Sequence, residues 1–349
     1  MKLLKVTAPV RSLVWQGGEL VDVLGGRAWS SDGVQRRTAT SHGPGLVGPG
    51  EWDGGDGSNG FDRCVVSPSG RYSVVYAERG AGALVLEGTC PLRELTRDPY
   101  HSEDFDYPVT LGVLGDGREI LVHCPQEYGV LQIEDVASGQ RLTRGAREAR
   151  DVFRSRLSVT GDGRHLLVAG WVWHPYGIVE VFDLEGALAD PAVLDGEGVL
   201  PRQSGIDAEV VSACWLDDDR LAVATGEDFL EDEEGPGLGP RRIGVWSLSR
   251  RQWLHRNSVG FEVGTLLAGG GRVLSLHGHP RLIDLRTGEV PAEWPEVKVS
   301  RCEGAYGVTH IPTPVAALSP DGTLLAVAQE ESIALIRLPS DAGSADLPP

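Results

Sequence analysis

The chain has 349 residues, of which 41% are hydrophobic, so it is long enough to bury a substantial core. Its 50 acidic residues outnumber its 32 basic residues, which gives a formal net charge of −18 at pH 7. Because proteins that bind DNA or RNA use lysine and arginine to neutralise phosphates, this charge excludes nucleic acid as an expected partner.

The N-terminal sequence MKLLKVTAPV carries neither the apolar core nor the small-residue cleavage site of a secretory signal. No later segment approaches the roughly 20 apolar residues that cross a bilayer as a helix. We therefore expect a cytoplasmic protein that makes no membrane contact. Only three of the basic residues are lysines, and this arginine bias, with abundant glycine and alanine, indicates a GC-rich genome and hence a bacterial source.

A tight polar turn followed at once by a short apolar run occurs seven times along the chain. The second residues of successive turns are 46 to 56 residues apart, which matches the repeat length of β-propeller blades. We therefore predict an all-β fold, a single seven-bladed β-propeller of four-stranded antiparallel blades. The seven turns are Gly17-Gly18, Ser69-Gly70, Asp116-Gly117, Asp162-Gly163, Asp218-Asp219, Gly270-Gly271 and Asp321-Gly322.

The last blade, at about residues 314–338, has three strand-like runs and needs a fourth strand. The N-terminal segment 2–7 (KLLKVT) has the length and pattern to supply it, and a ring that does not close leaves two exposed sheet edges. We predict that this N-terminal strand closes the ring, so that the propeller spans residues 1–339. The tail 340–349, rich in alanine, aspartate and proline, is expected to be disordered.

Third strands often end in an acidic residue and a turn of the form D-[LV]-x-[ST]-G-[EQ], as at residues 135–140 and 284–289. The glycine supplies the positive φ that such a turn needs. Together with the repeat length, this pattern resembles the WD40 family in a degenerate bacterial form, over essentially the whole chain. No blade carries both the Gly-His pair and the terminal Trp-Asp of that family. The resemblance implies a propeller fold.

Three segments depart from the regular repeat, and loops on a rigid frame are where function is expected. Thr40–Asp62 is dominated by glycine and proline, and Gly226–Arg242 carries an acidic run between the second and third strands of its blade. Each of these two is either a flexible surface loop or a segment that orders on a partner. Trp171–Tyr176 (WVWHPY) lies between the second and third strands of the fourth blade, where its aromatic rings either fill space between blades or form an exposed patch.

We predict that the aromatic segment and the acidic insertion bind another protein. Tryptophan and tyrosine give large contact areas at low entropic cost, and four adjacent carboxylates suit a partner with a basic surface. The predicted partner-binding residues are Trp171, Trp173, His174, Tyr176, Phe229, Leu230, Glu231, Asp232, Glu233 and Glu234.

The sequence contains no G-x-S-x-G elbow, H-E-x-x-H pair, P-loop or EF-hand loop, so we predict no catalytic residues, no cofactor and no metal. His277 and His279 could offer two imidazoles to a metal, but the sequence locates no third ligand. The five cysteines are scattered and form no C-x-x-C pair, which favours buried reduced thiols.

The leading hypothesis is a non-enzymatic interaction module, a scaffold or regulatory subunit of a multiprotein bacterial system. One alternative is a propeller enzyme of the lactonase or hydrolase type, with a metal site in the central channel. Another is a protease target or regulator that is cleaved in a flexible insertion, since exposed loops are preferred cleavage sites.

Overall fold

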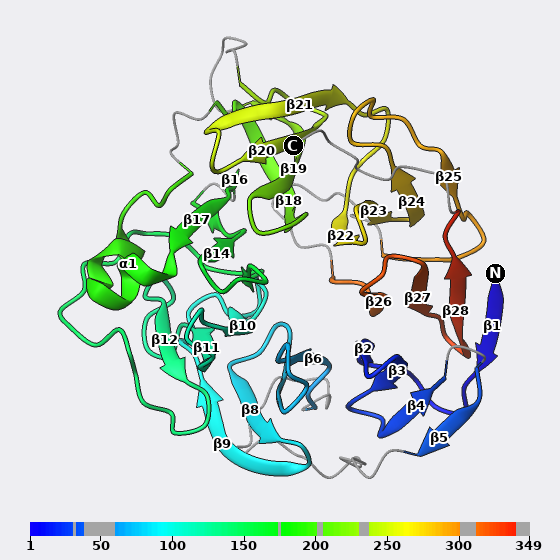
Figure 1. Cartoon of the computed structure of the whole chain (residues 1–349), viewed down its shortest axis with the longest axis horizontal. Helices are drawn as coiled ribbons and strands as arrows, with labels where there is room; N and C mark the ends of the chain where they lie inside the picture. The colour runs from blue at the N-terminus through cyan, green and yellow to red at the C-terminus, as the bar shows by residue number, and fades with distance from the viewer. Residues whose placement is uncertain are drawn as a thin grey trace.

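The computed structural model describes residues 1–30, 33–37, 60–173, 176–200, 205–229, 237–300 and 312–339. These residues form seven antiparallel blades arranged in a ring, and the chain passes from blade to blade in sequence order (Figure 1). The prediction of an all-β, seven-bladed propeller is confirmed. The predicted tail 340–349 lies outside the described residues.

The blades are numbered from 1 to 7 in the order in which their first strands occur. Their first strands lie nearest the centre of the ring (Figure 1). Blades 1, 2, 5 and 6 are each a run of four consecutive strands. These are β2 (Val14–Gln16), β3 (Glu19–Asp22), β4 (Arg27–Trp29) and β5 (Gln35–Arg37); β6 (Arg63–Val66), β7 (Tyr72–Tyr76), β8 (Gly82–Glu87) and β9 (Cys90–Thr96); β18 (Ala208–Trp215), β19 (Arg220–Phe229), β20 (Arg242–Ser247) and β21 (Gln252–Ser258); and β22 (Thr265–Gly269), β23 (Arg272–His277), β24 (His279–Ile283) and β25 (Ala292–Glu293).

Blades 3, 4 and 7 depart from this consecutive pattern. Their strands are β10 (Val109–Val113), β11 (Glu119–His123) and β12 (Gln132–Asp135); β13 (Ser158–Val159), β14 (His165–Val168) and β17 (Glu180–Asp183); and β26 (Ala316–Leu318), β27 (Leu324–Ala328), β28 (Ser332–Arg337) and β1 (Lys2–Lys5).

All seven predicted turns join the first strand of a blade to its second strand. Six of them contain a glycine with positive φ, among them Gly117 at +85° and Gly163 at +71°. Glycine reaches this region without the steric cost that other residues incur, which explains why the same turn recurs at each blade. Blade 5 makes its turn at Asp218-Asp219 with aspartate hydrogen bonds instead, since Asp217 Oδ1 accepts from the backbone N–H of Asp219 at 2.9 Å.

The N-terminal strand closes the ring, as predicted. β1 pairs antiparallel with β28 in the register Leu3↔Ala334, and the N–H of Val6 donates to the carbonyl of Glu331 at 3.1 Å. The two strands, from opposite ends of the sequence, lie side by side in Figure 1. Leu4 is only 5% exposed and packs in a hydrophobic cluster shared by blades 7 and 1. Closure therefore provides hydrogen-bond partners for the backbone N–H and C=O groups on the outer edge of β28, and it buries apolar surface at the same time.

Blades 3 and 4 have three strands each among the described residues. In blade 3, an isolated bridge between Glu134 and Arg141 replaces the fourth strand. In blade 4, β17 runs directly into the short helix α1 (Leu184–Ala189) and the 3-10 helix η1 (Pro191–Asp195). Asp183 caps α1 by accepting a hydrogen bond from the N–H of Gly186 at 3.2 Å. Helix α1 lies on the outer side of the ring, next to β17 (Figure 1).

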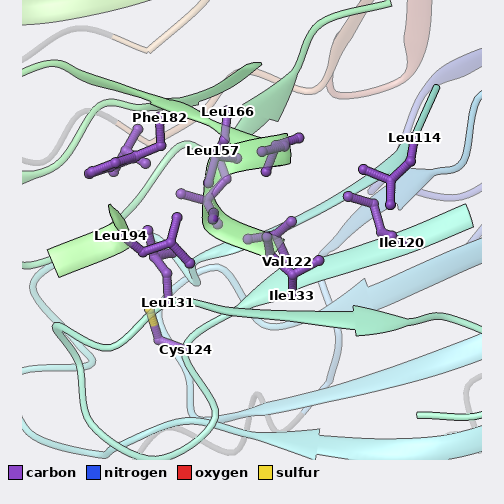
Figure 2. Packing of buried hydrophobic residues seen from close by; sticks show 13 residues of the cluster. Leu114, Ile120, Val122, Cys124, Leu131, Ile133, Leu157, Leu166, Phe182 and Leu194 are labelled. Carbon is purple, nitrogen blue, oxygen red and sulfur yellow. The ribbon is translucent and has the colours of Figure 1, made fainter. Parts of the chain in front are cut away.

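Hydrophobic clusters fill the spaces between neighbouring blades. Figure 2 shows the cluster between blades 3 and 4, in which Ile120, Leu131 and Phe182 are fully buried. Leu194 of η1 enters the same cluster with no exposed surface, and so do Leu184 and Ala187 of α1. Burying these side chains gives α1 and η1 the packing role that an outer strand has in the other blades.

Cysteine burial differs from the expectation. Cys124 is buried, Cys64 and Cys214 are partly buried, and Cys90 is exposed because it begins the outer strand β9, while Cys302 lies outside the described residues. Burial raises the pKa of the Cys124 and Cys214 thiols to about 12. Among the helices described, none is long and apolar enough to span a bilayer.

Candidate protein-binding face

The antiparallel order of each blade decides which loops meet on the same side of the ring. Loops that join the second strand of a blade to its third strand lie on the side of the ring where the first strands begin. Loops that join the fourth strand to the next blade lie on the same side. We call this side the entry face. It carries the loops 97–108, 124–131 and 144–157 and the connection 169–179. The acidic insertion opens on the same side, because it joins β19 to β20.

The aromatic segment forms a small hairpin on the entry face. Its strands are β15 (Trp171–Val172) and β16 (Tyr176–Gly177), paired in the register Trp171↔Gly177. On its other edge, β15 pairs with Phe153 through two backbone hydrogen bonds of 2.9 and 3.1 Å. Trp173, at the hairpin tip, is 42% exposed, whereas Trp171 and Tyr176 are partly buried. The predicted His174 lies outside the described residues.

Phe153 is the centre of a larger group of rings that the sequence did not reveal. Its side chain is fully buried and stacks on Trp171 and Tyr128, with centroid distances of 4.0 and 4.5 Å. Trp173 meets Phe153 edge to face at 5.2 Å. We call the whole group the aromatic patch; its members are Tyr100, His101, Phe105, Tyr128, Phe153, Trp171 and Trp173.

The loop 97–108 presents Tyr100 and His101 at the outer surface of the aromatic patch. Buried Arg97 holds this loop, because its guanidinium donates to the carbonyl oxygens of Ser102, Phe105 and Asp106 at 2.6, 3.0 and 3.2 Å. It also lies 4.4 Å from the centroid of the Phe105 ring. Burial lowers the pKa of Arg97 to about 10, so the side chain stays charged at neutral pH.

A buried ion network supports the neighbouring loop that carries Phe153. Arg154 and Arg150 both bind the carboxylate of Glu180 on β17, and Arg154 has no exposed surface. Arg147 pairs with Asp195 of η1 at 2.7 Å. Burial lowers the pKa of Arg154 to about 10, which leaves it cationic at neutral pH. The network therefore fixes the loop 144–157 between β17 and η1 and sets the position of Phe153.

Carboxylates surround the exposed rings. Asp104 Oδ2 lies 2.8 Å from His101 Nδ1, and Asp98 Oδ1 accepts from the backbone N–H of Tyr100 at 2.9 Å. Asp151 accepts from the Tyr128 hydroxyl at 2.7 Å. Burial, followed by this hydrogen bond, raises the pKa of Tyr128 to about 12, so the phenol stays protonated and keeps donating.

The acidic insertion adjoins the aromatic hairpin. The N–H of Gly177 donates to Glu209 of β18 at 3.2 Å, and the next strand, β19, ends at Phe229, which is paired with Ala208. The return limb is held where the N–H of Gly237 donates to Asp207 at 2.8 Å. The predicted residues Leu230, Glu231, Asp232, Glu233 and Glu234 lie outside the described residues, and Phe229 is described only as part of its strand.

Leu238, which follows the acidic run, is not available to a partner as a hydrophobic anchor. Its side chain has no exposed surface. It forms a parallel bridge with Ile206 and packs between blades 4 and 5. Leu238 therefore belongs to the core, because it fills space next to β20 that would otherwise be a void.

Two arginines at or near the start of first strands link different blades: Arg63 begins β6, and Arg156 lies just before β13. Arg63 donates to Glu78 at 2.7 Å and to the carbonyl of Thr313 at 3.0 Å. Arg156 donates to Asp106 at 3.0 Å and to the carbonyl of Val211 at 2.7 Å. These contacts join blade 2 to the segment that enters blade 7, and blade 3 to blade 5.

Within the described ranges, His101, Glu103 and Asp104 are the only group of three side chains whose ligand atoms come close enough to hold a metal ion, and the group is largely exposed. His277 and His279, considered from the sequence, turn to different carboxylates, Glu262 at 3.4 Å and Glu293 at 2.9 Å. The two imidazoles therefore do not converge on one ligand.

Comparison with known proteins agrees with this architecture. No protein-family model and no curated protein sequence matches the chain. Among solved structures, the chain is similar to a WD40 propeller in the crystal structure of a mitotic checkpoint complex, with a TM-score of 0.59. The chain has a WD40-like propeller fold. The match covers 97% of this chain and 91% of the other at 16% identity, a likeness that concerns the fold alone.

Proposed function

We propose that this WD40-like chain is a non-enzymatic protein-interaction module, a scaffold or regulatory subunit, that binds another protein with its entry face. The observation that carries the proposal is the aromatic patch, in which Tyr100 is 47% and Trp173 is 42% exposed above a buried Phe153. Large aromatic side chains held in a fixed arrangement dominate the energetics of many protein interfaces. Loops from blades 2, 3 and 4 supply the patch, so a partner would contact several blades together.

Charge favours a partner with a basic surface. The chain carries a net charge of −18, and the acidic run Glu231–Glu234 belongs to an insertion whose described stems adjoin the aromatic hairpin. The negative electrostatic potential of such a surface speeds association with a basic partner and disfavours binding of an acidic partner. A bacterial source, which the arginine bias of the sequence indicates, and a cytoplasmic setting are further parts of the proposal.

We test the proposal by affinity capture of the tagged chain from its native host. Replacing the two exposed rings together, Tyr100→Ala and Trp173→Ala, should lower the recovery of a stoichiometric partner at least about tenfold, because each ring contributes contact area near the centre of the interface. The matched control is Leu92→Ala, which truncates a 37% exposed apolar side chain on the outer strand β9. Equal recovery with the double variant and with the wild type would contradict the proposal.

A metal-dependent propeller enzyme is the alternative, and metal analysis of the same purified sample separates the two. Stoichiometric metal with no captured partner would replace the interaction module with the enzyme. In that case the group His101, Glu103 and Asp104 is where we would look first, since it offers one imidazole and two carboxylates.

A further inference from the structure

Three rings of the aromatic patch form a corner at its exposed edge. His101 meets Tyr100 at 4.5 Å and 81°, and it meets Trp173 at 5.2 Å and 83°. Tyr100 and Trp173 are 6.4 Å apart and inclined by 71°. Rings packed edge to face present their π-faces in different directions, and the faces of Tyr100 and Trp173 carry negative electrostatic potential. Such a corner favours a cation held against more than one ring.

The chain uses ring faces for its own arginines elsewhere but not at this corner. Among the described residues, six arginine–aromatic pairs occur, and none involves Tyr100, His101 or Trp173. The two arginines that flank the loop are engaged in contacts with the protein, since Arg97 donates to backbone carbonyls and Arg156 pairs with Asp106. Among the described residues, the faces of Tyr100 and Trp173 therefore have no arginine of the chain stacked on them.

Carboxylates lie beside the same rings. Ligand atoms of Glu103, Asp104 and His101 are all within 4.8 Å of one another, and both acidic side chains belong to exposed residues. Segment 98–106 (DPYHSEDFD) holds four carboxylates and neither lysine nor arginine. The corner thus combines aromatic faces with acceptors for charge-assisted hydrogen bonds, a pairing that complements a cationic side chain.

We propose, on the basis of the function proposed above, that this corner binds an arginine side chain of the partner. The guanidinium stacks on Tyr100 or Trp173 and donates to the carboxylates of Glu103 and Asp104. Arginine fits better than lysine because its planar group can stack on a ring and donate two parallel hydrogen bonds at once, whereas an ammonium is a compact and strongly hydrated charge. The partner is therefore a protein with an exposed arginine in a basic segment.

The test uses three fluorescein-labelled peptides of equal length, in which glycines separate three arginines, three lysines or three citrullines. Fluorescence anisotropy with the full chain should give a Kd for the arginine peptide about fivefold lower than for the lysine peptide, and lower still relative to the citrulline peptide. Tyr100→Leu with Trp173→Leu keeps the charge and should weaken arginine-peptide binding about fivefold. Asp104→Asn should weaken it without removing a ring, and Leu92→Ala should leave it unchanged.

Equal binding of the arginine and lysine peptides, or undiminished binding of the arginine peptide to the double leucine variant, would overturn the arginine proposal. Both variant side chains are exposed, and circular dichroism confirms that the variants are folded. If the peptides show no ring dependence while capture of the partner still depends on Tyr100 and Trp173, the arginine site is wrong and the interaction module stands. If neither peptide binding nor capture of the partner depends on Tyr100 and Trp173, both proposals are wrong.

Discussion

Replacing Gly163 with alanine should destabilise the propeller by about 2–5 kcal/mol. Gly163 has a φ of +71°, which costs other residues about 1–2 kcal/mol. A Cβ at this position would also overlap the carbonyl oxygen of Val113 and lie 2.8 Å from the Cα of Leu114, both in blade 3. Backbone atoms cannot move aside as a flexible side chain can, so overpacking adds a further ~1–3 kcal/mol. Thermal unfolding followed by circular dichroism measures the effect.

Gly117→Ala is the matched control for this change. Gly117 occupies the equivalent turn of blade 3 with a φ of +85°, and a Cβ there meets no atom within 4 Å. It should therefore show the conformational cost of about 1–2 kcal/mol without the clash between blades. An equal loss of stability in the two variants would mean that the contact between the Gly163 turn and blade 3 does not limit the spacing of the blades.

Phe153→Ala should cost about 3–5 kcal/mol of stability and also abolish capture of the partner. The Phe153 ring is fully buried and stacks on Trp171 and Tyr128, so its removal leaves a void under the exposed rings. Without that support the angles between Tyr100, His101 and Trp173 are no longer fixed. Near-ultraviolet circular dichroism and affinity capture below the unfolding temperature measure the two effects.

Trp29→Ala separates the two effects of the Phe153 change. Trp29 is only 1% exposed and packs in the hydrophobic cluster shared by blades 7 and 1, whereas loops from blades 2, 3 and 4 supply the aromatic patch. It should lose a similar amount of stability and still capture the partner. If both variants lost capture to the same degree, the loss would reflect general destabilisation and the aromatic patch would have no special part in binding.

Much of the fold could be predicted from the sequence because a propeller repeats the same local structure, with the same turn, in each blade. Every blade needs a tight turn between its first and second strands, and glycine in positive φ solves it in six of seven cases. The repeat of these turns therefore gave the number of blades. Closure by β1 was predictable because the last blade lacked a strand and the N-terminal segment had the length and pattern to supply it.

The outer side of blade 4 could not be predicted in the same way. A fourth strand was expected after Asp183, but the segment LEGALA contains good helix formers and follows an aspartate that caps helices well. The helical conformation is more stable here than a fourth strand because α1 and η1 bury Leu184, Ala187 and Leu194 against blade 3. Local helical signals were present, and the regular strand pattern of the other blades concealed them.

The aromatic patch was only partly visible in the sequence. Trp171 and Trp173 attract attention because only one residue separates them, whereas Tyr100, Tyr128 and Phe153 lie in three separate loops. Those loops come together on the entry face only because the blades of the propeller are arranged in a circle. Segment 98–106 was recognisable as unusual, because it mixes aromatic and acidic residues in a connection between blades. Its sequence does not show, however, that it contacts a hairpin some seventy residues later.

The most direct test of the proposed binding face is site-specific photo-cross-linking in the native host. A benzoylphenylalanine in place of Tyr100 puts the reactive group on the aromatic patch, and one in place of Asp116 puts it in an exposed turn on the opposite face. We expect a discrete cross-linked partner from position 100 and none from position 116. A partner that cross-links from position 116 and not from position 100 would show that the chain binds through its other face and would contradict the account.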